Sequence, residues 1–462
     1  MSVKWTKEQQ SVVDLRDRSI LVSAAAGSGK TAVLVERIIT MLTRQEDPHS
    51  VDELLIVTFT EAAAAEMKER IRRAIEKKAQ EDPFNEHLRQ QATLIHSASI
   101  TTIHSFCLSV IRENFHVIDL DPSFRIGEEG ELKLLERDVL QELLEEKYGE
   151  GQERFLAFAE SYASGKSDRR LEEIILKLYE FSRSCPDPEG WLADCVRACQ
   201  VQTGEELGKT PFFAFVREEV DHAMETAVRL KDQALALCLE PDGPYMYEEM
   251  LESDMKNVER FRQAATYARY RQASEQIAWK KLAPNRDKAV SKDKADRVKK
   301  LRKELKDEFD FLARQYFSQT EEELLAGLAV CAPMMAELKD LTEAFAARFE
   351  EKKRSRGMID YSDMEQYALR ILTEKTEEGL RPSPCARVYQ EQFREVMIDE
   401  YQDSNLIQEA ILTSVSRTWQ GRNNIFMVGD VKQSIYRFRL SRPELFMEKF
   451  DTYRIYEGEG TD

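Results

Sequence analysis

The sequence lacks long runs of apolar residues. Its start, Met1 to Glu8, is polar and has no apolar core of a secretory signal. No later run approaches the ~18 apolar residues that a membrane-spanning helix needs. Only seven cysteines are scattered over 462 residues, which excludes a small disulfide-stapled scaffold. We therefore expect a folded cytoplasmic protein with reduced thiols and no membrane partner.

Zinc-binding patterns are missing as well. Cys185, Cys195 and Cys199 come closest to a cluster, but they form no CxxC pair and no nearby His completes a zinc site. We interpret them as free structural thiols. The sequence also has no internal repeat or low-complexity tract, which excludes repeat architectures.

Charge is what the chain has in abundance. Charged residues make up 33% of it, hydrophobic residues 42%, and the formal net charge is -18. This acidic balance argues against a surface that coats nucleic acid non-specifically, but it leaves room for a narrow DNA groove. The stretch from Lys280 to Lys306 is locally basic. It is either a solvated, partly disordered helix and loop or a surface that contacts phosphates.

Five short apolar runs have the length and β-branched content of strands. They are Ser19 to Ser23, Leu54 to Thr58, Ser99 to Thr102, Val396 to Ile398 and Ile425 to Val428. Polar or glycine residues follow each run, as expected where ligands bind at the carboxyl ends of parallel strands. Between about Asp119 and Arg356, apolar residues at spacings of three and four predict helices instead. We predict an α/β fold with a doubly wound parallel sheet: residues 1–118 and 357–462 form one domain, and residues 119–356 a mainly helical insertion.

A candidate phosphate site follows the first predicted strand. Its residues are Ala24, Ala25, Ala26, Gly27, Ser28, Gly29, Lys30 and Thr31. Small residues let successive backbone N–H groups surround a phosphate, and the helix that follows adds its positive end. Lys30 would reach the β- and γ-phosphates of ATP, and the Thr31 hydroxyl would bind Mg²⁺. The alternative is a small-residue turn that only packs a helix against the sheet.

An acidic pair after the fourth predicted strand favours the nucleotide-site interpretation. Asp399 ends a buried apolar run, where a carboxylate could hold Mg²⁺. Glu400 is then placed to orient and deprotonate an attacking water. Two acids at a strand end can also be a solvated loop, but together with a phosphate loop they predict nucleotide hydrolysis.

These residues resemble the superfamily 1 DNA helicases of the UvrD and RecB kind, most closely the AddA type found in bacterial helicase–nucleases. The similarity covers the start through about Arg112 and the end from about Asp360, and Asp399 to Asp403 matches the DExxQD box of that family. The resemblance implies a RecA-like P-loop domain with DNA-dependent ATPase and helicase activity in double-strand break repair and recombination.

Further motifs imply roles near the nucleotide. Trp5 to Gln9 looks like the Q motif, in which Gln9 would read the adenine edge. Val428 to Arg439 resembles motif III, in which Gln433 would sense the γ-phosphate. Ala32 stands where many UvrD relatives place an arginine, so that adenine contact is not carried over.

The resemblance also implies contacts to DNA. Phe59 and Thr60 lie in a stretch that resembles motif Ia, where an aromatic ring stacks on a base and a hydroxyl bonds a phosphate. His104 lies in the next motif. The same resemblance places Tyr436, Phe438 and Arg439 of motif III on the DNA side.

The family implies three partners: single-stranded DNA, duplex DNA ends and a second helicase/nuclease chain of the AddB type. It implies a location in the bacterial cytoplasm, at the nucleoid when DNA is bound. We expect the second RecA-like domain and the nuclease domain to lie outside these residues, and therefore slow turnover by this portion alone. Two alternatives remain: a stand-alone UvrD-type repair helicase, or a nucleotide-gated module that binds DNA or a partner.

Overall fold

The structure is a computed structural model that describes residues 4–25, 27–162, 167–377, 379–434, 441–456 and 458. The chain divides into two compact units. Unit 1 comprises Met1–Glu150, Ser167–Glu189 and Thr342–Asp462, and unit 2 comprises Gly151–Lys166 and Gly190–Leu341. None of the helices in the described part of the chain combines the length and apolar composition that a bilayer crossing requires.

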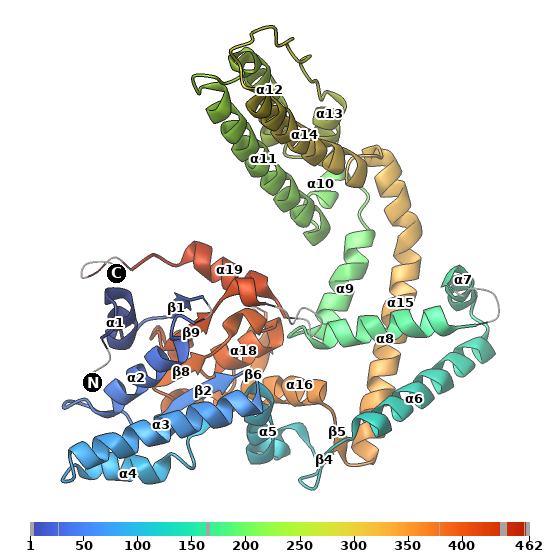
Figure 1. Cartoon of the computed structure of the whole chain (residues 1–462). Helices are drawn as coiled ribbons and strands as arrows, with labels where there is room; N and C mark the ends of the chain where they lie inside the picture. Colours follow the sequence, from blue (N-terminus) through green and yellow to red (C-terminus); the bar gives the residue numbers. More distant parts are fainter. Residues whose placement is uncertain are drawn as a thin grey trace. The chain divides into compact units, whose positions relative to one another are not determined.

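Unit 1 is built on a five-stranded sheet with the order β1-β9-β8-β2-β3 (Figure 1). The strands are β1 (Ile20–Ser23), β2 (Leu54–Thr58), β3 (Ser99–Thr102), β8 (Glu395–Ile398) and β9 (Ile425–Gly429). Every neighbouring pair is parallel. The predicted α/β fold and its five strands are confirmed, and the two last strands lie between the first and the second.

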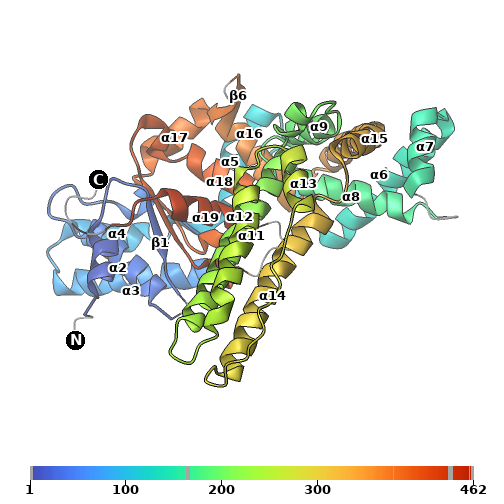
Figure 2. The same ribbon diagram turned by 90° about the horizontal axis from the view of Figure 1, so that it is seen from above.

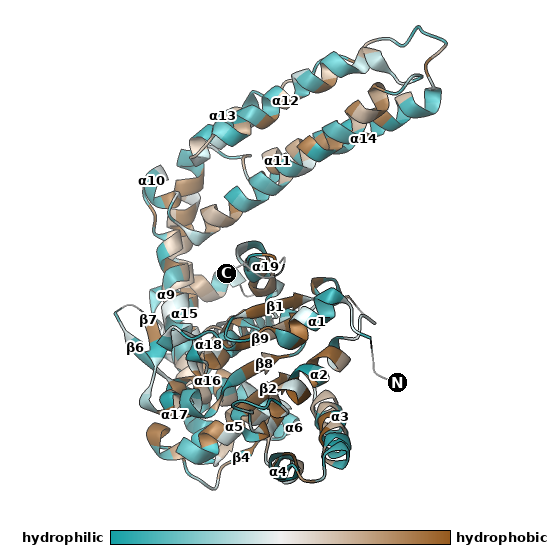
Figure 3. Cartoon of the chain, turned by 90° about the vertical axis from the view of Figure 1, so that its left-hand side faces the viewer, coloured by the Kyte–Doolittle hydropathy of each residue, from teal (hydrophilic) through white to brown (hydrophobic). Residues whose placement is uncertain are grey.

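Both faces of this sheet are covered, because alternate residues of a strand point to opposite sides. Leu55 and Val57 of β2 join one buried cluster, to which helices α5, α16 and α18 contribute. Leu54 and Ile56 join the other, with α2 and α3. Strands β2 and β9 are therefore buried and apolar along their length, and both carry brown colour in Figure 3.

The helices of unit 1 begin and end as follows. They are α1 (Lys7–Asp14), α2 (Lys30–Leu42), α3 (Glu61–Glu81), α4 (Glu86–Leu94), α5 (Ile103–Asn114), α6 (Glu129–Glu150), α8 (Arg169–Arg183), α16 (Tyr361–Leu372), α17 (Pro384–Gln392), α18 (Leu406–Ser414) and α19 (Pro443–Thr452). Short 3-10 turns are η1 (Val51–Glu53), η2 (Phe115–Ile118), η4 (Tyr401–Asp403), η5 (Arg417–Gln420) and η6 (Val431–Gln433). Two small strand pairs complete the unit: β4 (Arg125–Ile126) with β5 (Met358–Ile359), and β6 (Thr373–Thr376) with β7 (Gly379–Pro382).

Unit 2 has helices, joined by turns and loops, and no strand among its described residues. It contains α7 (Glu153–Tyr162), α10 (Gly204–Leu207), α11 (Pro211–Cys238), η3 (Tyr245–Tyr247), α12 (Glu248–Gln263), α13 (Tyr267–Glu275) and α14 (Lys292–Gln315). Helices α9 (Pro188–Cys199) and α15 (Glu321–Ser355) run across the unit boundaries. Helices α11 and α14 lie side by side (Figure 2), and Met224 and Phe309 belong to their shared buried core.

The compact units differ in extent from the predicted division at residues 118/119 and 356/357, which stays a prediction about domains. Helices α6 and α8 and the end of α15 belong to unit 1. Ion pairs link α6 to the last turns of α15, with Glu146 2.7 Å from Arg348 and Glu142 3.2 Å from Lys352. Periodicity alone could not show which helices pack beside the sheet.

Candidate nucleotide and DNA site

The strand order brings three loops from distant parts of the sequence to one edge of the sheet. Strand β9 lies between β1 and β8, so the loops that follow these strands are neighbours. The ladder between β1 and β9 continues into the first loop, where the Ala24 N–H donates to the Gly429 carbonyl at 3.1 Å. The candidate phosphate loop therefore lies beside the segment that begins at Asp430.

Glycine is required at two positions of the phosphate loop. Gly27 and Gly29 have φ values of 77° and 82°, a left-handed backbone conformation that is strained for residues with a side chain. Gly29 is also the N-cap of α2, so Lys30 is the first residue of that helix. The helix thus directs the unpaired N–H groups of its first turn towards the loop, which is the arrangement that binds anions.

Lys30 and Glu400 meet although 370 positions separate them. The Lys30 ammonium lies 3.2 Å from one carboxylate oxygen of Glu400 and 3.3 Å from the other. Glu400 has a left-handed backbone (φ 53°, ψ 44°), which non-glycine residues adopt at a cost of about 1–3 kcal/mol. Contacts around Glu400 must offset the cost of this backbone conformation, and the ion pair with Lys30 is one of these contacts.

Asp399 lies beside this pair at the end of β8. Burial raises the pKa of the Asp399 carboxyl, the neighbouring Glu400 adds to the rise, and Lys30 opposes it. Burial likewise raises the pKa of Asp403, whose Oδ1 is buried without a hydrogen-bond partner. Three carboxyl groups thus gather around one ammonium, an excess of acid that a divalent cation would offset.

Thr31 and Asp399 fit a Mg²⁺ ion that shares its ligands with phosphate and water better than they fit a metal that is bound by protein ligands alone. Within the described ranges, no group of three or more His, Cys, Asp or Glu residues could hold a metal ion. Magnesium usually takes one or two protein oxygens and completes its octahedron with phosphate and water. Thr31 and Asp399 supply oxygen ligands of the kind that such a site needs, and their predicted role as metal ligands stays a prediction.

A buried glutamine joins the acidic loop to the segment after β9. The Gln402 amide donates to Glu400 Oε2 at 2.8 Å and accepts from the Asp430 N–H at 2.9 Å. Asp430 in turn accepts from the Gln433 amide at 2.6 Å. Gln433 is therefore linked to Glu400 through Asp430 and Gln402, and its role as a sensor of the γ-phosphate stays a prediction. Gln402 carried no predicted role, although its fixed place in the DExxQD box was a usable signal.

Gln9 supports the phosphate loop in this structure. Its amide oxygen accepts from the Thr6 N–H at 3.0 Å, and its NH₂ group donates to the Ser28 carbonyl at 3.1 Å. The first bond belongs to the capping box of α1. Both ends of the amide are thus engaged, and the reading of adenine by Gln9 stays a prediction.

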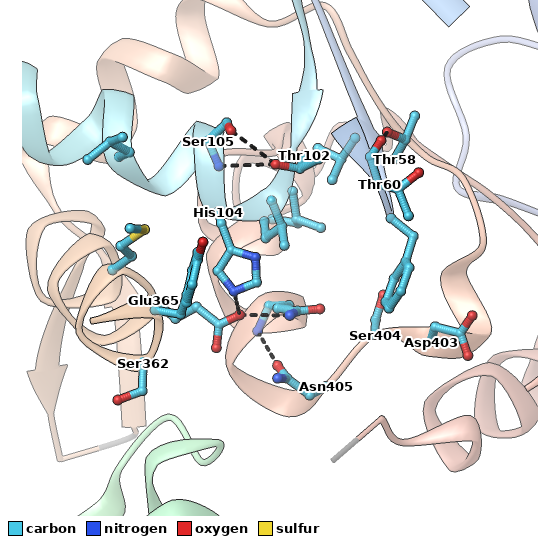
Figure 4. A pocket seen from close by; sticks show the side chains of 18 of the residues that line it. Thr58, Thr60, Thr102, His104, Ser105, Ser362, Glu365, Asp403, Ser404 and Asn405 are labelled. Carbon is cyan, nitrogen blue, oxygen red and sulfur yellow. Dashed lines mark hydrogen bonds and ion pairs between the residues drawn. The ribbon is translucent and has the colours of Figure 1, made fainter. Parts of the chain in front are cut away.

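A cavity of about 1160 Å³ opens where the ends of β2, β3 and β8 meet (Figure 4). Phe59, Thr60 and His104 line it together with Asp399 and Glu400. The structure thus brings three predicted DNA-contacting residues and two predicted nucleotide residues to one cavity. Their roles towards DNA stay predictions.

The position of His104 in this cavity is set by neighbours on α16. Its Nε2 lies 3.3 Å from Glu365 Oε1, and its ring packs edge-on against Tyr361 at 5.2 Å (Figure 4). Gln408 of α18 donates to the same Glu365 oxygen at 2.7 Å. The His104 side chain is therefore held by α16, and α18 in turn holds Glu365.

Four predicted site residues lie outside the described part of the chain. They are Ala26, Tyr436, Phe438 and Arg439.

The basic stretch forms the connection after α13 and the first half of α14, and acids neutralise part of it. Arg302 is buried and donates to Asp254 at 2.6 Å and 2.9 Å. Lys280 pairs with Glu249. The overall positive charge of this stretch is therefore smaller than the sequence indicates.

The fold and the site together define a class of protein. A parallel sheet whose first strand leads through a glycine loop into a helix, with the acids Asp399 and Glu400 directly after β8, is a RecA-like α/β nucleotide-binding domain. The family described as UvrD/REP helicase N-terminal domain matches residues 5–205 and 245–454. The chain belongs to this family.

Several proteins resemble the chain over its whole length. It is 48% identical over 459 residues to the A subunit of the ATP-dependent helicase/nuclease from Lachnoclostridium phytofermentans, with 98% of this chain and 33% of that protein covered. The protein of the same name from Geobacillus thermodenitrificans is 44% identical over 456 residues, covering 97% of this chain and 37% of the relative. The chain thus spans about a third of the length of these relatives.

Proposed function

We propose that this chain binds ATP with Mg²⁺ and forms the first motor domain of a DNA-translocating helicase–nuclease. The observation that carries the proposal is the ion pair between Lys30 and Glu400, which joins the phosphate loop to the acidic loop. Family membership supports ATP use, and the shared name of the relatives supports the helicase–nuclease assignment over a stand-alone repair helicase.

The ion pair explains how binding and hydrolysis would be linked. A triphosphate in the loop offers Lys30 stronger anionic partners than one carboxylate, so Lys30 would leave Glu400 for the β- and γ-phosphates. Glu400 would then be free to accept the proton of an attacking water. The helix N-terminus at Gly29 and Lys30 would hold the phosphates in line for that attack.

The Mg²⁺ ion would supply charge neutralisation for the phosphates when bound. Thr31 and Asp399 would hold it through their side-chain oxygens. The raised pKa of Asp399 would fall as its carboxylate gains a cation, so binding of the metal should release protons.

Single-stranded DNA is the substrate we propose for the cavity. Phe59 offers a ring on which a base can stack, and Thr60 offers a hydroxyl at the start of α3. The cavity also reaches Glu400, so DNA and nucleotide would be bound by adjacent parts of the same loops. Duplex DNA ends and a second helicase/nuclease chain complete the proposed assembly, which we assign to the bacterial cytoplasm.

Titration of a fluorescent ATP analogue, with and without single-stranded DNA, tests this function. Lys30→Ala should weaken Mg-nucleotide binding about 10- to 100-fold, because it removes hydrogen bonds from a charged donor. Lys231→Ala is a matched control, since Lys231 is also a half-buried lysine paired with an acid, Glu252, but lies in unit 2. Equal binding by the Lys30 variant and the wild type would refute the proposal.

A second variant separates a motor from a nucleotide-gated binding module. Glu400→Gln should retain nucleotide binding, because it removes the acid that competes for Lys30, and should abolish hydrolysis. A gated binder needs no general base and would keep its full activity in this variant. Hydrolysis at the wild-type rate by Glu400→Gln would therefore contradict the motor assignment.

A further inference from the structure

Gln402 occupies a buried position between the acidic loop and the end of β9. The residue is 1% exposed, and its amide makes three hydrogen bonds. The NH₂ group donates to Glu400 at 2.8 Å and to Asp403 at 3.3 Å, and the oxygen accepts from the Asp430 N–H at 2.9 Å. An amide is the side-chain group that can donate to one loop while accepting from another.

The lack of a side chain at Gly429 is independent evidence that the end of β9 packs tightly against the Gln402 amide. A Cβ at Gly429 would lie 2.4 Å from Gln402 Oε1 and 3.0 Å from a ring carbon of Phe446. Its φ lies outside the left-handed range, so glycine is needed here for close approach rather than for backbone conformation. The end of β9 is therefore fitted to the Gln402 amide.

The contacts form one path from the phosphate loop to the segment after β9. Lys30 donates to Glu400, Gln402 donates to Glu400, and the Asp430 N–H donates to Gln402. The Asp430 carboxylate holds the Gln433 amide at 2.6 Å. If Lys30 turned to a phosphate, Gln402 would remain as a donor to the Glu400 carboxylate. A shift of that carboxylate would then move the Gln402 amide, whose oxygen accepts from the Asp430 N–H.

We infer that Gln402 is a positioning residue that holds Glu400 for water activation and transmits its position to the Asp430–Ser434 segment. The inference rests on the proposed function, because it needs a nucleotide that takes Lys30 away from Glu400. Gln402 would thus link Glu400 to Gln433 without itself contacting the nucleotide or the DNA.

Amide hydrogen exchange of the 425–434 segment, without nucleotide and with Mg²⁺ and the non-hydrolysable analogue AMP-PNP, tests this inference. Without nucleotide, Gln402→Leu should exchange the Asp430 amide about tenfold faster, because one buried hydrogen bond is lost. In the wild type the analogue should change exchange over Asp430–Ser434. In Gln402→Leu this response should vanish, although the analogue still binds within about threefold of the wild type.

Two further variants separate the halves of the amide. Gln402→Glu keeps an acceptor for the Asp430 N–H but cannot donate to Glu400, so it should keep slow Asp430 exchange and lose the response to the analogue. Gly429→Ala displaces the same amide from the other side and should reproduce Gln402→Leu. These variants also carry the test should the leucine variant fail to fold.

Gln390→Leu is the matched control. Gln390 is equally buried, donates to the Ser414 carbonyl at 2.7 Å and accepts from Gln420 at 3.0 Å, but contacts neither acidic loop nor β9 end. An unchanged Asp430 amide in Gln402→Leu, a wild-type response in Gln402→Glu, or an equal loss in Gln390→Leu would overturn the inference. Failure of the wild type to bind the analogue would overturn both the proposed function and the transmitted response. The exchange rates measured without nucleotide would still test the hydrogen bond between Asp430 and Gln402.

Discussion

Replacing Arg37 by methionine removes one guanidinium that joins three segments of the nucleotide site. Arg37 lies in α2, behind the phosphate loop, and donates to Glu395 of β8 at 2.8 Å and 2.5 Å. It also donates to the carbonyls of Val12 and Leu15, at 2.6 Å each, where α1 ends. Helix α1 carries Gln9 and strand β8 leads to Asp399.

The loss of stability should be large, because both partners are buried. Arg37 is 1% exposed and Glu395 5% exposed. Removing one member of a buried ion pair leaves a charge that solvent cannot reach, and typically costs about 3–5 kcal/mol. The guanidinium also lies 4.5 Å from the centre of the Phe426 ring, a contact that methionine partly retains.

The loss should depend on pH, with a defined sign. Burial raises the pKa of Glu395, and Arg37 opposes that rise. Without Arg37 the folded-state pKa rises further above the value of about 4.3 in the unfolded chain. The folded variant then binds a proton that the unfolded chain releases, so its stability falls as pH rises through this window. The deficit should therefore be smaller at about pH 5 than at about pH 8.

Urea titration followed by amide exchange in β8 and β9 measures the effect in unit 1 alone. Arg394→Met is the control on the adjacent position: Arg394 pairs with Asp47, whose side chain is 74% exposed. Such a surface pair contributes about 0–1 kcal/mol. A deficit below about 1 kcal/mol for Arg37→Met, or one that does not change with pH, would refute the reasoning about the buried charge.

Three further outcomes follow from the site. Mg²⁺ should strengthen nucleotide binding more at about pH 7 than at about pH 5, because the pKa of Asp399 is raised above its ordinary value and the metal competes with the proton on this carboxyl; Asp399→Asn should reduce this difference in calorimetric titrations. Lys353→Met should destabilise unit 1 by about 3–5 kcal/mol in urea unfolding, because it removes a buried ammonium 2.5 Å from Asp360 and 2.6 Å from Asp363 and leaves Asp363 paired with Arg183; a loss within measurement error would contradict this. Phe59→Ala should weaken single-stranded DNA binding by about 1–3 kcal/mol in anisotropy titrations, and unchanged affinity would argue against base stacking there.

Local patterns in the sequence were sufficient for the elements that carry the site. The five apolar runs became the five strands of the sheet, because a run of strand length must bury both faces in a covered parallel sheet. The start of α2 at Lys30 follows from Gly29, whose left-handed backbone ends the loop. The strands and the start of this helix depend on residues only a few positions apart, so a short stretch of sequence is enough to predict them.

The family resemblance located the acidic box Asp399 to Asp403, but it did not predict which contacts the side chains of Glu400 and Gln402 make. Glu400 was predicted as a base, and the structure adds that its carboxylate pairs with Lys30. Gln402 was visible as a letter of the box, yet its contacts to Asp430 depend on how β9 packs. The amide of Gln9 bonds both Thr6 and Ser28: the Thr6–Gln9 spacing is that of a capping box, whereas the contact with Ser28 depends on the tertiary structure.

The sequence by itself determined the apolar strands, the glycine loop and the acidic turn, because each is specified by short-range periodicity and backbone preference. Only the tertiary structure decided that β9 lies between β1 and β8, and hence that Lys30, Glu400 and Gln402 share one network. The physical reason is that β1 pairs with β9 and β2 pairs with β8, through contacts between segments hundreds of residues apart. Their order reflects the burial of both sheet faces by all the helices together, which no local window of sequence contains.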